Sequence, residues 1–246
     1  GEDGLPVEFY DKFWNILSKE ITLVLNDIIV QPTIPSDFAN GIIVLIPKIP
    51  KPSRIQDYRP ITLLNSDYKI FMRCLKRRLA PHTDTILGGQ QQAVRKEGNI
   101  LNVLSAIRDS ISESQISNSG KMILSLDFDH AFDRVSHDYL FHTMQRFGID
   151  VALINIIKKI FAIATTKILI NGRLTASLKI ERSVRQGCPL AMHLFAIAIE
   201  PFLQKLQHCL QQDKQTIVRA FADDVSIVIT KQQHLQEIER ITAEYM

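Results

Sequence analysis

Apolar residues recur with helical spacing at the start of the chain. Between residues 8 and 30 they fall at three- and four-residue intervals, at Phe9, Phe13, Ile16, Leu17, Leu23, Val24 and Ile28. This spacing predicts an amphipathic helix that Pro32 and Pro35 end. A continuous apolar run at residues 42–46 predicts a buried strand. The prolines at positions 50 and 52 predict a stiff basic loop over residues 48–54.

The remaining pattern mixes helices with strands. It predicts helices over residues 66–79, 99–112, 151–164 and about 189–210, and a last helix from about His234 that the chain cuts off at Met246. Ser136 is the predicted N-cap and Gly148 the predicted stop of one further helix. Residues 117–120 predict a turn, and Asn171-Gly172 predicts a hairpin between residues 167–170 and 173–178. Because helices and strands do not alternate regularly, the pattern favours an α+β fold.

Composition is that of a globular domain. The chain has 246 residues, of which 46% are hydrophobic and 22% charged, near the size at which a single core stops growing. No run of about 18 apolar residues predicts a membrane span. Cys74, Cys188 and Cys209 lack metal-ligand spacing, and an odd number of cysteines without a secretion signal predicts reduced thiols inside a cell. The chain opens without methionine, so we expect it to be part of a longer one.

Positive charge is concentrated in one segment. Nine basic residues oppose only Asp57 and Asp67 between positions 48 and 78, a net +7 that leaves −4 for the rest of a chain of net charge +3. The nine are Lys48, Lys51, Arg54, Arg59, Lys69, Arg73, Lys76, Arg77 and Arg78. This asymmetry predicts a phosphate-binding surface. For the last three residues, a solvated helix face is the alternative.

Three aspartates carry the candidate chemistry. Asp127 ends the apolar segment 122–126, and Asp223 and Asp224 stand together within the apolar segment 220–229. Carboxylates set against apolar segments repel one another and cost free energy to desolvate, and a divalent cation removes both penalties. Two Mg²⁺ ions roughly 3.5–4 Å apart clamp the attacking and leaving oxygens of a phosphoryl displacement. The pattern therefore predicts a metal-dependent nucleotidyltransferase. An exposed hairpin turn is the plainer interpretation of the Asp-Asp pair.

Five segments follow one another in a recognisable order. They are residues 41–48 (GIIVLIPK), 57–64 (DYRPITLL), 125–133 (SLDFDHAFD), 185–190 (RQGCPL) and 221–224 (FADD). In this order and with these gaps they resemble the reverse transcriptase domain of non-LTR retrotransposons of the long interspersed element kind. The opening Gly1-Glu2-Asp3-Gly4 is similar to the family's entry motif. The resemblance covers nearly the whole chain.

The resemblance implies a right-handed polymerase fold, with fingers and an antiparallel palm sheet but no thumb. The implied parts are a helical extension (1–40), fingers (41–120), a first part of the palm (121–181), a loop with a long helix (182–212), and a palm hairpin with the start of a helix (213–246). The implied reaction in retrotransposition is RNA-directed DNA synthesis from a primer 3′-hydroxyl, with an RNA template, a DNA primer and dNTPs as partners. Endonuclease and thumb regions are expected in the parent polyprotein, and a nuclear and cytoplasmic ribonucleoprotein is the implied location.

The resemblance also implies the metal ligands. Asp127 and Asp223 would bridge two Mg²⁺ ions, for which Mn²⁺ would substitute. Asp224 would have a weaker role, and Phe128 would contribute its backbone carbonyl. Asp129 is expected near the triphosphate without being a principal ligand.

The remaining site residues match the family's nucleotide contacts. Lys48 and Arg59 would meet the incoming triphosphate, with Arg54 as a second candidate, although Arg59 is alternatively a structural partner of Asp57. A bulky Phe132 under the sugar would clash with a 2′-hydroxyl, and its alternative is a core phenylalanine.

Gln186 and Gly187 match the family's loop beside the templating base pair. Cys188 is expected to be a packed residue and Asp133 to cap or pair structurally.

Two departures weaken parts of the match. Ala191-Met192 replaces the family's usual Ser-Pro, and residues 90–96 lack the usual Gly-Phe after the glutamine. Besides the reverse transcriptase, two other functions stay open. One is a catalytically inactive retrotransposon remnant that binds RNA or a protein partner, and the other is an RNA-copying RNA polymerase with a similar palm. The side chain of Phe132 distinguishes the RNA polymerase from the reverse transcriptase.

Overall fold

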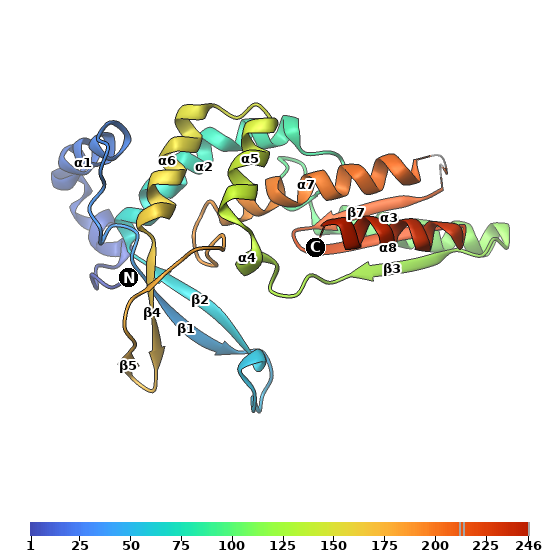
Figure 1. Ribbon diagram of the computed structural model, residues 1–246, viewed down its shortest axis with the longest axis horizontal. Helices are drawn as coiled ribbons and strands as arrows, with labels where there is room; N and C mark the ends of the chain where they lie inside the picture. The colour runs from blue at the N-terminus through green and yellow to red at the C-terminus, as the bar shows by residue number, and fades with distance from the viewer. Residues whose placement is uncertain (212, 214, 246) are drawn as a thin grey trace. The chain divides into compact units, whose positions relative to one another are not determined.

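Helices and strands are mixed along the chain, as the pattern predicts (Figure 1). The computed structural model describes residues 1–211, 213 and 215–245. They form two units, each made of two chain segments. The first unit joins Gly1–Arg78 to Phe132–Ala191, and the second joins Leu79–Ala131 to the chain from Met192 onwards. We describe each unit by itself.

The first unit is built on a mixed sheet. Its strands are β1 (Gly41–Pro47), β2 (Tyr58–Leu64), β4 (Thr165–Ile170), β5 (Arg173–Leu174) and β6 (Leu178–Lys179). The order is β2-β1-β4-β5, and β6 also pairs with β4. β1 and β2 form an antiparallel hairpin, whereas β1 and β4 run parallel. A short 3-10 helix, η1 (Ile55–Asp57), lies in the loop between β1 and β2.

β1 corrects one expectation about burial. The strand predicted at residues 42–46 forms, but only Gly41 in it is buried, and Ile46 is 49% exposed. The side chains of residues 42–45 are only partly covered, so a continuous apolar run did not mean full burial.

The predicted Asn171-Gly172 hairpin is confirmed. Both residues have positive φ, 49° and 77°, as a tight two-residue turn requires.

Five helices lie wholly or largely in the first unit. They are α1 (Val7–Val30), α2 (Ser66–Ile86), α4 (Ala131–Arg134), α5 (His137–Arg146) and α6 (Val151–Ile163). As predicted, Ser136 caps α5 and Gly148 follows it with a φ of 74°. Lys159 of α6 donates hydrogen bonds from Nζ to the carbonyls of Ile28, Ile29 and Gln31, 2.8–3.2 Å away. A cation thus satisfies the last carbonyls of α1, which have no partner within the helix.

The second unit is built on an antiparallel sheet, as the resemblance implies. The order is β3 (Met122–Leu126), β8 (Asp224–Ile229) and β7 (Ile217–Phe221). Its helices are α3 (Ile100–Ser117), α7 (Ala191–Leu210) and α8 (Gln233–Tyr245), the last being the helix predicted from about His234. Met246, where the prediction ended that helix, lies outside the described residues.

The core of the second unit contains side chains of α7 and β8. Ile197, Leu203 and Leu206 of α7 are fully buried, and so are Val225 and Ile227 of β8. Burying each such side chain stabilises the fold by about 1.5–3 kcal/mol. The strand that begins with Asp224 is therefore anchored in the core.

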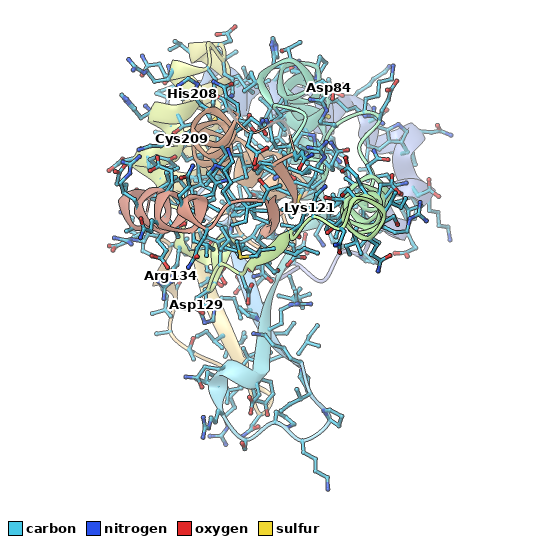
Figure 2. The ribbon with its side chains drawn as sticks, turned by 90° about the vertical axis from the view of Figure 1, so that its right-hand side faces the viewer. Asp84, Lys121, Asp129, Arg134, His208 and Cys209 are labelled. Atoms are coloured by element: carbon cyan, nitrogen blue, oxygen red, sulfur yellow. The ribbon has the colours of Figure 1, made fainter. Side chains whose placement is uncertain are left out.

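β3 is also tied to α3. Lys121, directly before β3, donates from Nζ to Ser110 Oγ (3.2 Å) and Glu113 Oε2 (2.6 Å) of α3. Its side chain is only 4% exposed, and Figure 2 shows it beside the helix. The Glu113 side chain is 59% exposed, so the ion pair is partly open to solvent, and it ties α3 to the start of the strand that Asp127 follows.

Three helices are longer or shorter than predicted, and proline explains part of the difference. α3 runs to Ser117, whereas the prediction ended this helix at Ser112 and placed a turn at residues 117–120. α2 spans Ser66–Ile86 and continues through Pro81, whereas the prediction ended it at Leu79. α7 contains Pro201 and begins at Ala191, two residues after the predicted start. A proline within a helix removes one hydrogen bond without ending the helix where packing compensates. No helix of the described chain is both long and apolar enough to cross a lipid bilayer.

Candidate active site

The three aspartates lie at one end of the second unit's sheet. β3 ends at Leu126, which pairs with Val225 of β8. The antiparallel register therefore places Asp127, the next residue, opposite Asp224. Phe221 pairs with Asp224 across the β7–β8 hairpin, so Ala222 and Asp223 form its two-residue turn. Two segments almost a hundred residues apart in the sequence thus bring three aspartates to the same end of the sheet.

The carboxylates are more exposed than the sequence pattern indicated. Asp127 and Asp224 are exposed, and Asp223 is half-buried. β3 itself has no buried residue. The expected desolvation cost therefore does not apply to the exposed Asp127 and Asp224, and mutual repulsion is the stronger reason for these carboxylates to hold a cation.

The donor chemistry fits a hard divalent cation, because all three side chains offer carboxylate oxygens. Among the described residues, however, no three His, Cys, Asp or Glu side chains are placed to hold a metal ion. The strand ends place the three aspartates at one end of the sheet, but in the part of the chain that the structure describes their side chains do not form a set of metal ligands. The ligand roles of Asp127, Asp223, Asp224 and Phe128 stay predictions.

The chain turns away from the sheet directly after Asp127. The ring of Phe128 packs edge-on against Phe202 of α7, with 5.6 Å between centroids, and lies 6.3 Å from the ring of Tyr245 of α8. His130 has a φ of 52° and pairs with Asp129 at 3.3 Å. Asp129, labelled in Figure 2, thus does not continue the strand beyond Asp127.

Lys48 and Arg59 lie near each other along the first unit's hairpin. Arg59 of β2 pairs with Ile46 of β1, and Lys48 follows directly after β1, which ends at Pro47. Both side chains are exposed. The Lys48 backbone donates to the Asp57 carbonyl at 2.7 Å, which closes the loop between them.

Asp57 is held by its own loop and not by Arg59. Its Oδ2 accepts the backbone N–H groups of Ser53 and Arg54, both at 2.8 Å. These hydrogen bonds, with help from the charge of Lys48, hold the pKa of Asp57 below its ordinary value of 3.8. No ion pair joins Arg59 to Asp57 in the described part of the chain, so the structure does not support the structural alternative for Arg59.

Gln186 and Gly187 lie against β2. The Gln186 carbonyl accepts the Thr62 N–H at 2.9 Å. Gly187 has a φ of 110°, and a Cβ there would lie 2.4 Å from the Thr62 carbonyl oxygen. Glycine is therefore required by the close approach to a strand, a reason that the sequence did not indicate.

Asp133 pairs structurally, as expected. Its two carboxylate oxygens accept Ser183 Oγ at 3.1 Å and Gln186 Nε2 at 3.4 Å. The neighbouring Phe132 is half-buried, and its carbonyl accepts the Val184 N–H at 2.9 Å. Half-burial leaves both interpretations of the Phe132 ring open.

Arg185 is a buried residue that sequence reasoning did not single out. It donates to the Ala39 carbonyl at 2.5 Å and to the Tyr68 hydroxyl at 2.9 Å, and its guanidinium lies 5.0 Å from the Tyr68 ring centroid. The same hydroxyl lies 3.4 Å from the Cys188 sulfur. Burial raises the pKa of the Cys188 thiol, which agrees with the packed role expected for it. Only the surrounding fold reveals this cluster.

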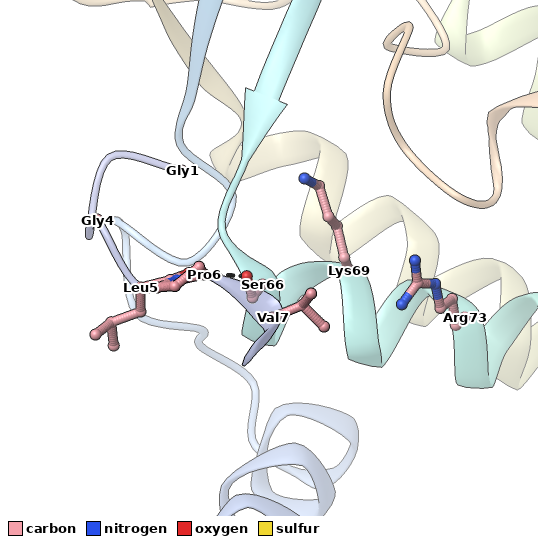
Figure 3. Close-up of a pocket in the computed structure, with 8 residues that line it drawn as sticks. All are labelled: Gly1, Gly4, Leu5, Pro6, Val7, Ser66, Lys69 and Arg73. Carbon is pink, nitrogen blue, oxygen red and sulfur yellow. Dashed lines mark hydrogen bonds between the residues drawn. The ribbon is translucent and has the colours of Figure 1, made fainter. Parts of the chain in front are cut away.

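Two basic residues of the segment 48–78 line a cavity (Figure 3). Lys69 and Arg73 project from α2 toward the N-terminal segment, and the cavity has a volume of about 340 Å³. Its other lining residues are Gly1, Gly4, Leu5, Pro6, Val7 and Ser66. The charge makes this cavity a candidate for anionic groups.

Comparison with known proteins identifies the class. The family model described as reverse transcriptase (RNA-dependent DNA polymerase) matches residues 49–246. The chain is 33% identical over 246 residues to the transposon TX1 uncharacterized 149 kDa protein of Xenopus laevis, covering 98% of this chain and 19% of that protein. It is 30% identical over 191 residues to the retrovirus-related Pol polyprotein from type-1 retrotransposable element R2 of Popillia japonica, covering 75% of this chain and 26% of that protein.

The fold is shared with solved telomerase structures. Apo telomerase from Candida tropicalis superposes with a TM-score of 0.64 at 14% identity, covering 93% of this chain and 46% of that chain. The predicted right-handed polymerase fold is thereby confirmed. The chain belongs to the reverse transcriptase family, as a domain of the kind found in non-LTR retrotransposon polyproteins. It spans about a fifth of the TX1 protein's length.

Proposed function

We propose that this chain adds dNTPs to a primer 3′-hydroxyl on an RNA template, with two Mg²⁺ ions. One observation carries the proposal. In a chain of the reverse transcriptase family, the β3–β8–β7 register places Asp127 opposite Asp224, with Asp223 in the adjoining turn. Rigid strands are suited to hold such groups at a fixed separation.

The metal-holding residues would be Asp127 and Asp223, with Asp224 and the Phe128 carbonyl beside them. When bound, the two cations would lower the pKa of the primer hydroxyl and neutralise the triphosphate and leaving pyrophosphate. The packing of the Phe128 ring on Phe202 orients the backbone at this point. The carboxylates supply the negative charge that attracts the ions and fixes where they lie.

The residues that match the family's nucleotide contacts would bind the incoming dNTP. Lys48 and Arg59, both exposed at the β1–β2 hairpin, would offset charge on the triphosphate, and arginine binds two oxygens at once. Gln186 and Gly187 would lie beside the templating base pair. The Phe132 ring would exclude a 2′-hydroxyl.

The proposal is tested by Mg²⁺-dependent dNTP incorporation on a primed RNA template. Asp223→Asn is expected to abolish incorporation, because it removes a ligand charge without changing side-chain size. Asp109→Asn is the matched control, since Asp109 lies in α3 of the same unit with its side chain 70% exposed. Equal incorporation by Asp223→Asn and the parent would contradict the metal assignment.

A parent chain that binds the primed RNA without extending it would favour the alternative of an inactive binding module. The same assay tests the sugar contact. If the Phe132 ring excludes ribonucleotides, Phe132→Ala will incorporate them, and unchanged sugar selectivity would remove this role.

A further inference from the structure

The side chain of Gln91 grips the backbone of the turn that precedes Asp223. Its Nε2 donates to the Ala222 carbonyl at 3.2 Å, and its Oε1 accepts the Ala222 N–H at 3.0 Å. Gln91 has no exposed surface. One fully buried carboxamide therefore satisfies both backbone groups of a single residue.

Ala222 needs such support because its backbone is strained. Its φ is 57°, in the left-handed region that residues with a Cβ rarely adopt. Strained residues persist where the surrounding structure over-determines their conformation. The two hydrogen bonds with Gln91 hold Ala222 in its left-handed conformation. Because Asp223 is the next residue of the turn, the conformation of Ala222 sets the direction of the Asp223 backbone.

The backbone around Gln91 is fixed on the same edge. The Ala220 N–H donates to the Gln90 carbonyl and the Gln92 N–H donates to the Ala220 carbonyl, both at 2.8 Å. Residues 90–92 thus add a short parallel bridge to β7, the edge strand of the sheet. The Gln91 side chain then reaches two residues further, to the turn.

Residues 88–92 are also hydrogen-bonded to helices α3 and α7. Gln92 accepts a hydrogen bond from Asn102 of α3 at 3.0 Å and donates to the Gly89 carbonyl at 2.7 Å. Glu200 of α7 accepts the Gly88 N–H at 2.8 Å. Gln91 is therefore presented from a rigid base, as a residue that positions others requires.

We propose that Gln91 is a positioning residue whose carboxamide locks Ala222 in its left-handed conformation and thereby places the Asp223 and Asp224 carboxylates. The effect on catalysis rests on the function proposed above. The lock, by which we mean the two hydrogen bonds that hold Ala222 in its left-handed conformation, does not depend on that function. A role confined to filling the core is the competing explanation. It predicts that any buried glutamine of this segment matters equally.

Gln92 provides the matched control, because it is also buried, with 9% exposure, and makes side-chain hydrogen bonds in the same loop but none to Ala222. The experiment compares the parent, Gln91→Leu and Gln92→Leu. Amide exchange of Ala222 is followed by NMR, and kcat and the Mg²⁺ concentration for half-maximal incorporation are measured. Gln91→Met, which has a similar length and lacks both hydrogen-bonding groups, serves if Gln91→Leu fails to fold.

Gln91→Leu is expected to speed exchange of the Ala222 amide about ten- to hundredfold, the range that loss of a buried hydrogen bond implies. The required Mg²⁺ concentration is expected to rise, with smaller changes in both quantities for Gln92→Leu. Unchanged Ala222 exchange in the Gln91 variant would overturn the lock. Faster exchange with unchanged Mg²⁺ dependence would overturn the positioning role. A parent without incorporation would count against the proposed function, while the exchange rates would still decide the lock.

Discussion

Glu200 is a fully buried carboxylate in the middle of α7. One oxygen accepts Gly88 N–H and Gln204 Nε2, at 2.8 and 2.9 Å, whereas the buried Oε2 has no hydrogen-bond partner among the residues that the structure describes. Burial raises the pKa of Glu200 above its ordinary 4.5, although the charge of Arg95 opposes this. The folded protein therefore binds this proton more tightly than the unfolded chain does.

The sign of the pH dependence follows from that raised pKa. The stabilisation is fully present below pH 4.5 and is lost as the pH rises from there through the folded-state pKa of Glu200. The slope is at most about 1.4 kcal/mol per pH unit for one proton. Glu200→Gln, which cannot ionise, is expected to gain stability relative to the parent over this range. Urea unfolding of both proteins between pH 4 and 8 measures the difference, and a difference independent of pH would contradict the prediction.

The sequence predicted some of the site residues and not others. The three aspartates, Lys48 and Arg59 were selected from motifs, and the structure brings the aspartates to one sheet end. Gln91 and Arg185 were missed, because their partners, Ala222 and Tyr68, lie more than 115 residues away. No local pattern distinguishes Gln91 from the glutamines on either side of it.

At the scale of the elements, α6 offers a direct test of local chemistry. Asp150 caps this helix, and its Oδ1 accepts the Ala152 N–H at 2.7 Å. Asp150→Ala is expected to lower the free energy of unfolding by about 1 kcal/mol, the usual value of an N-cap. Chemical denaturation measures the loss. Asp109→Ala, within α3, serves as the control, and an equal loss in both variants would show that the cap does not matter.

Elements fixed by local chemistry were predicted well. Ser136, Gly148 and the Asn171-Gly172 turn each mark a boundary where the structure has one. The parallel pairing of β1 with β4 was not foreseen, because it joins residues more than 120 positions apart. The extent of α2 beyond Pro81 was missed for a related reason, since packing of the whole helix outweighed the local preference of one proline.

At the scale of the whole molecule, ordered motifs predicted the family and the polymerase fold before any contact was known. The division into two units, each built from two chain segments, was not predictable in the same way. It depends on which distant segments pack together. The uneven charge, in contrast, was visible in the sequence and gives a prediction about nucleic acid.

Lys69 and Arg73, which line the cavity near the N-terminal segment, are expected to contact RNA phosphates. Replacing both by glutamine should reduce the slope of log K against log salt by about 1.4, because each contact to a single strand contributes about 0.7. Fluorescence anisotropy with a labelled RNA, over a salt series, measures the slope. Lys19→Gln with Lys231→Gln changes the net charge equally, and the same reduction in that pair would contradict a local contact.

The central claim is that the carboxylates at the end of the β3–β8–β7 sheet together bind divalent cations. Mn²⁺ binding measured by electron paramagnetic resonance tests it most directly, with an RNA template, a dideoxy-terminated primer and the next dNTP present. Asp127→Asn and Asp223→Asn should each weaken Mn²⁺ binding, and Asp109→Asn should bind like the parent. Equal Mn²⁺ affinity in all four proteins would contradict the account.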